Sequence, residues 1–311
     1  MAWTTDDIPD QTGRIAVVTG ANGGIGFEVA RELARKGARV IMACRDMERA
    51  GSARRAIIEE TPGASLEVQE IDLASLGSVR AAAGRILAAH PRIDLLVNNA
   101  GVMGIPERRT VDGFEMQLAV NHLGHFALTA LLLPALLAAP AARVVSVTSN
   151  GRIIGRPLGH ENPHLVDRYG PWRAYGQSKL AAVHFALELD RRFRRAGVAA
   201  RSLVVHPGFT HTDLQARSAR ETGDLLGRLS YAAVRRVGMS PARGALSLLR
   251  AATDPNVDGG TLYTPRWVNS GPPVRRPLFA RSRDPAAMRT LWEVSERETG
   301  VRLDLPTAHD A

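Results

Sequence analysis

Residues 14–26 of the chain read RIAVVTGANGGIG. The apolar run Arg14–Thr19 predicts a buried strand, and the segment from Phe27 onward places apolar residues at helical spacing. Three glycines lie in the turn between them. Glycine permits positive φ, and it lets a phosphate approach the free N–H groups at the start of a helix. The strand–turn–helix context therefore predicts a dinucleotide-binding turn rather than a simple tight turn.

Strand-length apolar runs alternate with helix-period segments as far as about residue 265. The expected strands are Arg14–Thr19, Arg39–Ala43, Leu66–Ile71, Leu95–Asn98, Val144–Thr148, Ala199–His206 and Thr261–Thr264. The expected helices are Phe27–Lys36, Ser75–Ala89, Phe114–Ala138, Trp172–Arg195 and Pro241–Thr253. Repeated strand–helix units predict an α/β fold. We expect a doubly wound parallel sheet of about seven strands, with helices on both faces.

The same alternation predicts the domain organisation. We expect residues 1–13 to be an N-terminal tail and 14–265 to be one dinucleotide-binding and catalytic domain. Residues 266–311 are expected to form a C-terminal extension packed on that domain. Two irregular connections, 150–171 and 209–239, follow strands at the edge where open α/β sheets bind ligands. We therefore expect both to be substrate-side loops.

The chain carries 40 basic and 31 acidic residues, a net charge of +9. A nucleic-acid site would need basic residues gathered on one surface with aromatic residues between them. The densest basic run, Arg191–Arg195, instead ends an expected helix, where cations favour the helix dipole. We therefore expect no nucleic-acid partner.

The single cysteine, Cys44, excludes an internal disulfide framework and fits a reducing compartment. The first 13 residues show neither a basic nor an apolar signal region. The longest apolar stretch, Phe126–Ala139, is short for a membrane span and contains Pro134. These features predict a cytoplasmic protein without an integral membrane segment.

The histidines raise the question of a metal site. Their spacings provide no evident carboxylate or cysteine partner set, and we therefore expect no metal. The histidines concerned are His122, His125, His160, His164 and His206.

Tyr175 and Lys179 lie one helical turn apart. An isolated pair of this kind is usually an ordinary surface pair, but this one follows the glycine turn by about 150 residues. A free tyrosine has a pKa of about 10, which is high for an acid or base at neutral pH. An ammonium about 4 Å from the phenol oxygen would lower that pKa by up to about 3 units. The pair therefore predicts proton transfer beside a bound dinucleotide.

Several motifs follow one another in a fixed order. They are Thr19-Gly20-x-x-x-Gly24-Ile25-Gly26, Asn98-Asn99-Ala100-Gly101, Asn121, Ser149, Tyr175 with Lys179, and Pro207-Gly208-Phe209-Thr210-His211-Thr212. Together they resemble the short-chain dehydrogenase/reductase family over roughly residues 14–265. Ala43-Cys44-Arg45-Asp46 and the long interval from Ser149 to Tyr175 are most similar to its retinol-dehydrogenase-related branch. Protochlorophyllide reductase is a neighbouring possibility, but its active-site cysteines have no counterpart here.

The resemblance implies a Rossmann-like fold and a catalytic set. In this set Tyr175 is the general acid/base, Ser149 hydrogen-bonds the substrate oxygen, Lys179 binds the nicotinamide ribose and Asn121 holds a relay water. It also implies cofactor contacts from Gly20, Asn22, Gly24, Ile25, Gly26, Arg45, Asp72, Leu73, Asn98, Ala100, Tyr175, Lys179, Pro207, Gly208, Thr210 and Thr212. The resemblance further implies a homodimer or homotetramer, formed through the helices of Asn121 and Tyr175.

The residues after the second strand indicate which cofactor is used. An acid there accepts the adenosine ribose hydroxyls, whereas an arginine accommodates a 2′-phosphate. Cys44 occupies the usual place of the acid and Arg45 follows it, which favours NADP(H) over NAD(H). A register slip of one residue would bring Asp46 into that place and leave NAD(H) open.

These features together predict an NADP(H)-dependent oxidoreductase that interconverts a carbonyl and an alcohol on an apolar small molecule. The apolar character follows from the candidate wall residues, although Arg152 and Arg156 weaken it. These wall residues are Val102, Met103, Ile153, Ile154, Leu158, Phe209, Leu214, Leu225 and Leu226. The alternative is a non-catalytic NADP(H)-binding redox sensor, which would have no need of an acid.

Overall fold

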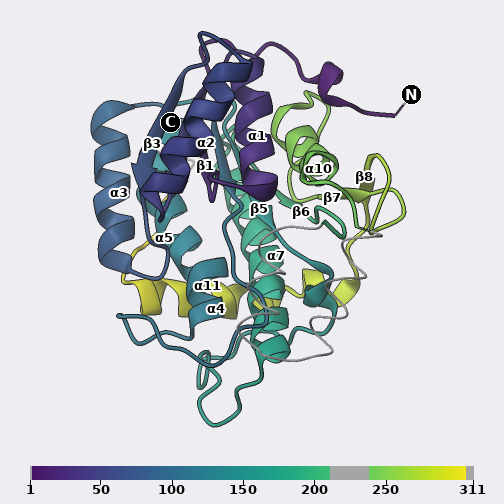
Figure 1. Cartoon of the computed structure of the whole chain (residues 1–311). Coiled ribbons are helices and arrows are strands. Elements are labelled where there is room, and N and C mark those ends of the chain that lie inside the picture. The colour runs from purple at the N-terminus through teal and green to yellow at the C-terminus, as the bar shows by residue number, and fades with distance from the viewer. Residues whose placement is uncertain (1, 211–237, 306–311) are drawn as a thin grey trace.

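The protein is described by a computed structural model that covers residues 2–210 and 238–305 (Figure 1). One eight-stranded sheet runs through it in the order β3-β2-β1-β4-β5-β6-β7-β8. Its strands are β1 Ile15–Thr19, β2 Arg39–Cys44, β3 Leu66–Glu70, β4 Leu95–Asn98, β5 Arg143–Val147, β6 Arg201–Val205, β7 Leu262–Pro265 and β8 Pro273–Arg276. The seven expected strands are all present and parallel.

The eighth strand, β8, was not expected. It pairs antiparallel with β7 at the edge of the sheet. Its sequence, Pro273-Val274-Arg275-Arg276, begins with proline and lacks a run of apolar residues. Proline is tolerated at the start of an edge strand, since no neighbour on the outer side needs its missing N–H.

Helices cover both faces of the sheet (Figure 1). They are α1 Gly24–Arg35, α2 Met47–Glu60, α3 Leu76–Ala89, α4 Met116–Leu118, α5 Gly124–Leu131, α6 Leu133–Leu137, α7 Pro171–Arg195, α10 Pro241–Thr253 and α11 Pro285–Thr299. The 3₁₀ turns are η1 Thr5–Asp7, η3 Asn150–Ile153 and η4 Ala280–Arg283, and η2 Ala119–Leu123 is a π-helical turn. The expected helix Phe114–Ala138 is therefore interrupted, by η2 and by Pro134 at the start of α6.

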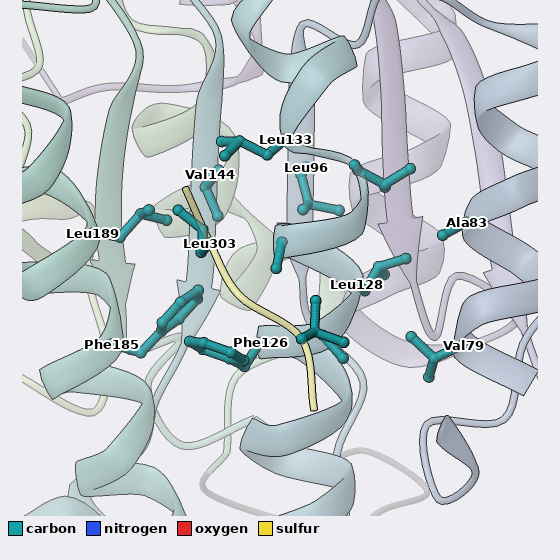
Figure 2. Packing of buried hydrophobic residues seen from close by; sticks show 14 of the residues in the cluster. Val79, Ala83, Leu96, Phe126, Leu128, Leu133, Val144, Phe185, Leu189 and Leu303 are labelled. Atoms are coloured by element: carbon teal, nitrogen blue, oxygen red, sulfur yellow. The ribbon is translucent and has the colours of Figure 1, made fainter. Parts of the chain in front are cut away.

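Alternate side chains of the strands enter two separate hydrophobic layers. Val17 belongs to the layer beneath α3, α5, α7 and α11, whereas Ala16 and Val18 belong to the layer beneath α1, α2 and α10. Figure 2 shows the first layer, where Phe126 and Phe185 lie close to Leu303 from the end of the chain. This two-sided burial explains why several of the strands are continuous apolar runs.

Helix α7 is buried on every side over much of its length. Every residue from Ala174 to Asp190 is buried. The sheet covers one side, and α11 lies against the other, with Trp292 stacked on Phe185 at 6.1 Å between ring centroids. All residues of α5 from Gly124 to Ala130 are buried as well. Helix α11 therefore covers part of the surface of α7, and the homodimer or homotetramer expected through these helices stays a prediction.

The apolar helices of the described chain are short or interrupted by charge. None of them combines the length and the apolarity that crossing a bilayer requires.

Candidate active site

The glycine turn is fastened to the segment that follows β4. Thr19 Oγ1 accepts hydrogen bonds from the N–H groups of Asn99 (2.9 Å) and Ala100 (3.0 Å), and Asn99 Nδ2 donates to the Thr19 carbonyl (2.9 Å). Gly20 has φ +67°, and a Cβ at Gly26 would lie 2.3 Å from the Gly20 carbonyl oxygen. Side chains at these two positions would break the turn, which explains the glycines.

The first turn of α1 is suited to an anion. No side chain caps it and no acidic residue lies in it. Its N–H groups and the positive end of the helix dipole are therefore available to a phosphate, as a dinucleotide requires. Asn22 and Ile25, both half-buried, flank this turn. The residues present thus fit the diphosphate of the expected cofactor.

The end of β2 carries a neutral group where an acid was expected in NAD(H)-dependent proteins. The backbone N–H groups of Ala21 and Asn22 donate to the Cys44 sulfur, and burial raises the pKa of that thiol to about 11. Arg45 is exposed beside it. The Asp46 carboxylate accepts from Arg49 N (3.0 Å) and caps α2. Asp46 is the acid that a register slip of one residue would bring into this place. Its carboxylate is instead engaged as the N-cap of α2.

Three expected cofactor residues use their side chains within the protein. Asn98 Nδ2 donates to Thr129 Oγ1 (3.1 Å), which joins β4 to α5. Leu73 is buried, and a Cβ at Gly124 would lie 2.5 Å from its carbonyl oxygen. Asp72 Oδ1 accepts from Ala74 N (2.9 Å), just before Ser75 caps α3.

Tyr175 lies in the first half of α7 and is almost fully buried. Ser149, directly after β5, hydrogen-bonds to it. Trp172 meets the Tyr175 ring edge-on, at 6.0 Å between centroids. A Cβ at Gly151 would lie 2.8 Å from Tyr175 Cε1, so the chain after β5 can pass the ring only because residue 151 is glycine. The ring is thus fixed between α7 and the turn that carries Ser149.

Lys179 also faces this site. Its Nζ donates to the Val147 carbonyl (3.3 Å) and lies 5.9 Å from the centroid of the Tyr175 ring. Burial lowers the pKa of Lys179 to about 8 and raises the pKa of Tyr175 to about 12, although the Ser149 hydrogen bond opposes the latter shift. The predicted lowering of the tyrosine pKa is therefore wrong for this structure. The reason is that burial removes the hydration of the phenolate, and only the Ser149 hydrogen bond opposes this effect.

The π-helical turn η2 presents Asn121 to the same site. Asn121 Oδ1 accepts from Val102 N (2.8 Å), and Nδ2 donates to the Val102 carbonyl (2.9 Å) and to Ser178 Oγ (2.9 Å). A Cβ at Gly101 would lie 2.9 Å from Asn121 Oδ1 and 3.4 Å from Lys179 Nζ. Single π turns occur often at functional sites, because they re-aim one side chain.

The sequence motifs did not single out Ser178 as a site residue. It is fully buried, and its hydroxyl donates to the Tyr175 carbonyl (2.8 Å) while it accepts from Asn121. The available signal was helical periodicity, since residues three and four apart share a face and Ser178 and Lys179 lie at those spacings from Tyr175.

The segment after β6 passes close to the hairpin between β7 and β8. Gly208 has φ +83°, and the Asn269 carbonyl accepts from Phe209 N (3.1 Å). Thr210 is buried and its Oγ1 donates to the Pro207 carbonyl (3.3 Å). Thr212, expected to contact the cofactor, lies outside the described residues, as does His211.

The histidines have individual roles within the core. His125 Nε2 and Thr19 Oγ1 form a hydrogen bond of 2.9 Å, and His122 Nε2 bonds with Ser295 Oγ (2.7 Å). In the part of the chain that the structure describes, no three His, Cys, Asp or Glu residues are grouped as metal ligands.

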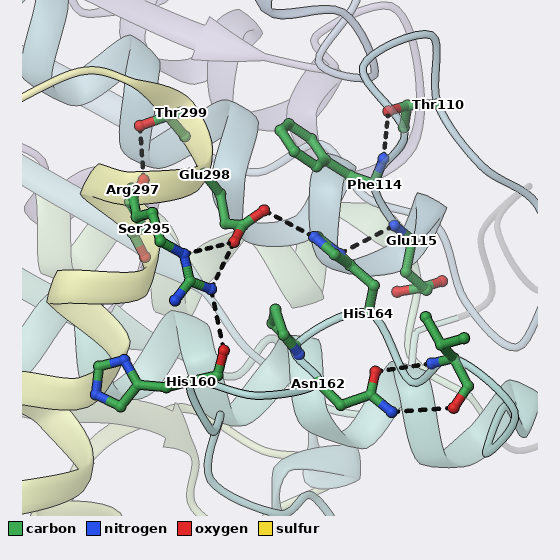
Figure 3. Close-up of polar contacts among 12 residues, drawn as sticks. Thr110, Phe114, Glu115, His160, Asn162, His164, Ser295, Arg297, Glu298 and Thr299 are labelled. Carbon is green, nitrogen blue, oxygen red and sulfur yellow. Dashed lines mark hydrogen bonds and ion pairs between the residues drawn. The ribbon is translucent and has the colours of Figure 1, made fainter.

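Polar contacts join the connection 150–171 to α11 (Figure 3). His164 stacks on Phe114 at 5.2 Å and bonds through Nε2 to Glu298 Oε2 (2.9 Å). Arg297 bonds both to Glu298 Oε1 (2.6 Å) and to the His160 carbonyl (3.1 Å). Burial alone would raise the pKa of Glu298, but the hydrogen bonds from His164 and Arg297 lower it. The last described helix therefore helps to shape the loop beside Tyr175.

The chain resembles known proteins over most of its length. A family model described as short chain dehydrogenase matches residues 14–223. Retinol dehydrogenase 13 of Homo sapiens is 44% identical over 211 residues, which are 68% of this chain and 62% of that protein. Retinol dehydrogenase 12 of Mus musculus is 38% identical over 297 residues, 94% of this chain and 88% of that protein. The chain thus matches less than two thirds of the human relative's length.

Two solved structures share the fold. A protein from Mycobacterium Paratuberculosis is 39% identical, with a TM-score of 0.81 over 98% of this chain and 100% of that chain. A short chain dehydrogenase from Escherichia coli CFT073, complexed with NADPH, is 27% identical, with a TM-score of 0.64 over 81% of this chain and 97% of that one. The glycine turn, the residues around Tyr175 and these similarities agree. The chain belongs to the short-chain dehydrogenase family of oxidoreductases, in the branch related to the retinol dehydrogenases.

Proposed function

We propose that the protein is an NADP(H)-dependent oxidoreductase that interconverts a carbonyl and an alcohol on a small molecule with an apolar body. The observation that carries this proposal is the meeting of Tyr175, Ser149 and Lys179 around one buried phenol. A phenol with its pKa raised to about 12 keeps its proton at neutral pH. It is therefore ready to act as an acid, as reduction of a carbonyl requires.

The reduced cofactor supplies the hydride to the carbonyl carbon. Tyr175 donates the proton to the carbonyl oxygen, and the Ser149 hydroxyl hydrogen-bonds that oxygen as negative charge develops. The Lys179 ammonium stabilises the phenolate that remains and binds the nicotinamide ribose. In the opposite direction the same phenolate takes the proton of the alcohol.

Asn121 supports this arrangement as a positioning residue. Its side chain joins Val102 to Ser178, and through them it brings the Gly101 backbone against Lys179. The relay water that the family resemblance implies would lie on this side of Lys179. Loss of Asn121 is expected to disturb the lysine before it disturbs the tyrosine.

Preference for NADP(H) is supported by charge at the adenosine end. Cys44 is a neutral thiol, Asp46 is used as a helix cap, and Arg45 is exposed. The Asp46 carboxylate is therefore directed to the start of α2, and the Arg45 guanidinium is the exposed charged group that can bind a 2′-phosphate. A pocket between the glycine turn and α2 lies beside them, lined by Asn22, Phe27, Glu48, Arg49, Ser52 and Ala53.

The described residues on the substrate side also support an apolar body for the substrate. Ile153, Ile154 and Phe209 expose large apolar side chains there. Leu158, in contrast, is buried in the hydrophobic layer beneath α7 and is not a wall residue. Val102 and Met103 are half-buried. The remaining expected wall residues, Leu214, Leu225 and Leu226, lie outside the described residues.

The test is consumption of NADPH with a panel of aldehydes, ketones and quinones. We expect turnover with apolar carbonyl compounds. We also expect Tyr175→Phe to lose at least about 10²-fold of it while binding NADPH nearly as well as wild type. Tight NADPH binding without turnover on any member of the panel would instead indicate the non-catalytic sensor. Near-normal turnover of Tyr175→Phe would refute the role of the tyrosine.

A further inference from the structure

Arg152 lies three residues after Ser149, within η3. Only 7% of its surface is exposed. A buried guanidinium normally faces a carboxylate, because an unpaired charge inside a protein is strongly unfavourable. No carboxylate pairs with Arg152 anywhere in the described chain, and burial lowers its pKa without any compensating acid. A cation this close to the catalytic serine thus lacks its usual partner.

The hydrogen bonds of Arg152 use only one end of its guanidinium. Nη1 donates to the Ser149 carbonyl (3.0 Å) and to Asn150 Oδ1 (3.3 Å). Nε is fully buried and has no partner. Nε and Nη2 form one edge of the planar group, and no bond leaves from that edge to a described residue. Because Nε is covered by protein, Nη2 is the atom of this edge at which a carboxylate can bind.

His206, directly after β6, shares this environment. Neither of its ring nitrogens makes a hydrogen bond of good geometry, although the Asn269 side chain lies beside the ring. Burial, and next the charge of Arg152, lower the pKa of His206 to about 3, so the ring is neutral and offers one N–H. Lys179 acts on the same ring. The charges of Arg152 and Lys179 thus both act on a buried ring whose nitrogens lack well-formed hydrogen bonds.

We propose that Arg152, with His206, forms a second subsite beside the reducing centre and holds a carboxylate of the substrate there. This inference rests on the proposed function and narrows its substrate class. The substrate is a carbonyl compound with an apolar body and a carboxylate. The carboxylate binds Nη2 of Arg152 while the carbonyl meets Ser149 and Tyr175. The alternative is a purely structural role, in which Arg152 stabilises the turn η3 by donating to the Ser149 carbonyl.

Oxo acids of increasing chain length, each compared with its methyl ester, test the subsite. With NADPH and the wild-type protein we expect the best acid to have a KM at least about 10-fold below that of its ester, as a charge-assisted hydrogen bond provides. Arg152→Met is expected to raise the KM of that acid by about 10- to 100-fold and to bring the acid-to-ester ratio toward one.

Arg156→Met is the matched control. Arg156 belongs to the same loop and is exposed, so the variant removes the same charge from the surface and should preserve the ratio. Equal KM values for acid and ester across the whole series in the wild type would overturn the subsite. A ratio that Arg152→Met leaves in place would overturn it as well.

Two further measurements separate this inference from its alternatives. If neither acids nor esters consume NADPH, the proposed function fails, and calorimetric titration of the corresponding hydroxy acids tests the subsite alone. Binding to wild type that Arg152→Met abolishes would support it, and no binding to wild type would overturn it.

Urea unfolding tests the turn-closing role, because removing an unpaired buried charge should not lower the midpoint. A marked fall in the midpoint with an unchanged ratio would assign Arg152 to the turn alone.

Discussion

Asn121 Nδ2 and Ser178 Oγ are 2.9 Å apart, and this hydrogen bond joins the π turn η2 to the helix that carries Tyr175. The Ser178 hydroxyl in turn donates to the Tyr175 carbonyl. The bond thus couples the backbone that faces Lys179 to the backbone of Tyr175. It is buried, so solvent cannot replace it.

Ser178→Ala should therefore cost about 1 kcal/mol in the free energy of unfolding, because the Asn121 amide loses a buried acceptor. We also expect a lower kcat with little change in the KM for NADPH. The matched control is Ser202→Ala, since the Ser202 hydroxyl is buried without a partner. Urea unfolding and steady-state kinetics measure both effects. Equal loss of stability in the two variants would contradict the role of Ser178.

Gly151→Ala should displace the Tyr175 ring, since the added Cβ would lie 2.8 Å from Cε1 and a ring cannot bend aside. Misplacing a reacting group by about 1 Å can cost up to 10²-fold in rate, and we expect a loss of at least about 10-fold in kcat. Gly159→Ala is the control, because no atom lies within 4 Å of a Cβ at that position of the same loop. Normal turnover in Gly151→Ala would show that the ring position is not critical.

Arg45→Gln should raise the KM for NADPH by about 10- to 100-fold and leave the KM for NADH nearly as before, because only NADPH carries the 2′-phosphate. Arg55→Gln removes an exposed arginine from α2 that bonds with Ser52 (3.0 Å) and serves as the control. Parallel changes for both cofactors would defeat the assignment of Arg45.

Glu298→Gln should loosen the loop 150–171, because the charge that receives hydrogen bonds from His164 and Arg297 is removed. We expect a higher KM for substrate and faster tryptic cleavage at exposed Arg168. Glu293→Gln is the control. Its ion pair with His160 (3.2 Å) is exposed at the surface, and such pairs contribute little. Cleavage at equal rates in both variants would contradict the role of Glu298 in holding the loop 150–171 in place.

Burial lowers the pKa of His122 to about 3 in the folded protein. In the unfolded chain the pKa is about 6.5, so between these values only the unfolded state binds the proton. Stability should therefore fall as the pH falls from about 6.5, and this histidine contributes about 1.4 kcal/mol per pH unit to the slope. His122→Asn removes that part, and urea unfolding between these pH values measures it. Parallel curves for wild type and variant would contradict the buried neutral state.

Much of the fold follows from local patterns in the sequence. The seven parallel strands are apolar runs, and β1 and α1 flank a turn whose glycines are required by φ at Gly20 and by close packing at Gly26. Helices α2 and α11 were missed. Helix α2 buries only Ala50, Ala53 and Ile57, so its apolar stripe is weak. Helix α11 is stabilised by contacts with α7, which is far away in sequence.

For the candidate site, too, the sequence predicted some features and not others. The motifs predicted Tyr175, Lys179, Ser149 and Asn121 as one set, and the structure brings them together. The direction of the Tyr175 pKa shift was wrong, because it depends on burial, which the sequence does not show. The side chain of Asn98 faces Thr129, a contact between β4 and α5 that spacing alone does not predict.

The contact of α11 with the loop 150–171 has a consequence for the order in which the protein folds during its synthesis. Glu298, on α11, follows His164 by 134 residues in the chain. During translation the glycine turn and its neighbouring strands emerge first and have their partners at hand. The loop receives its His164–Glu298 support only after α11 has been synthesised. A nascent or prematurely terminated chain is therefore expected to acquire the nucleotide-binding half before it can shape the substrate entrance.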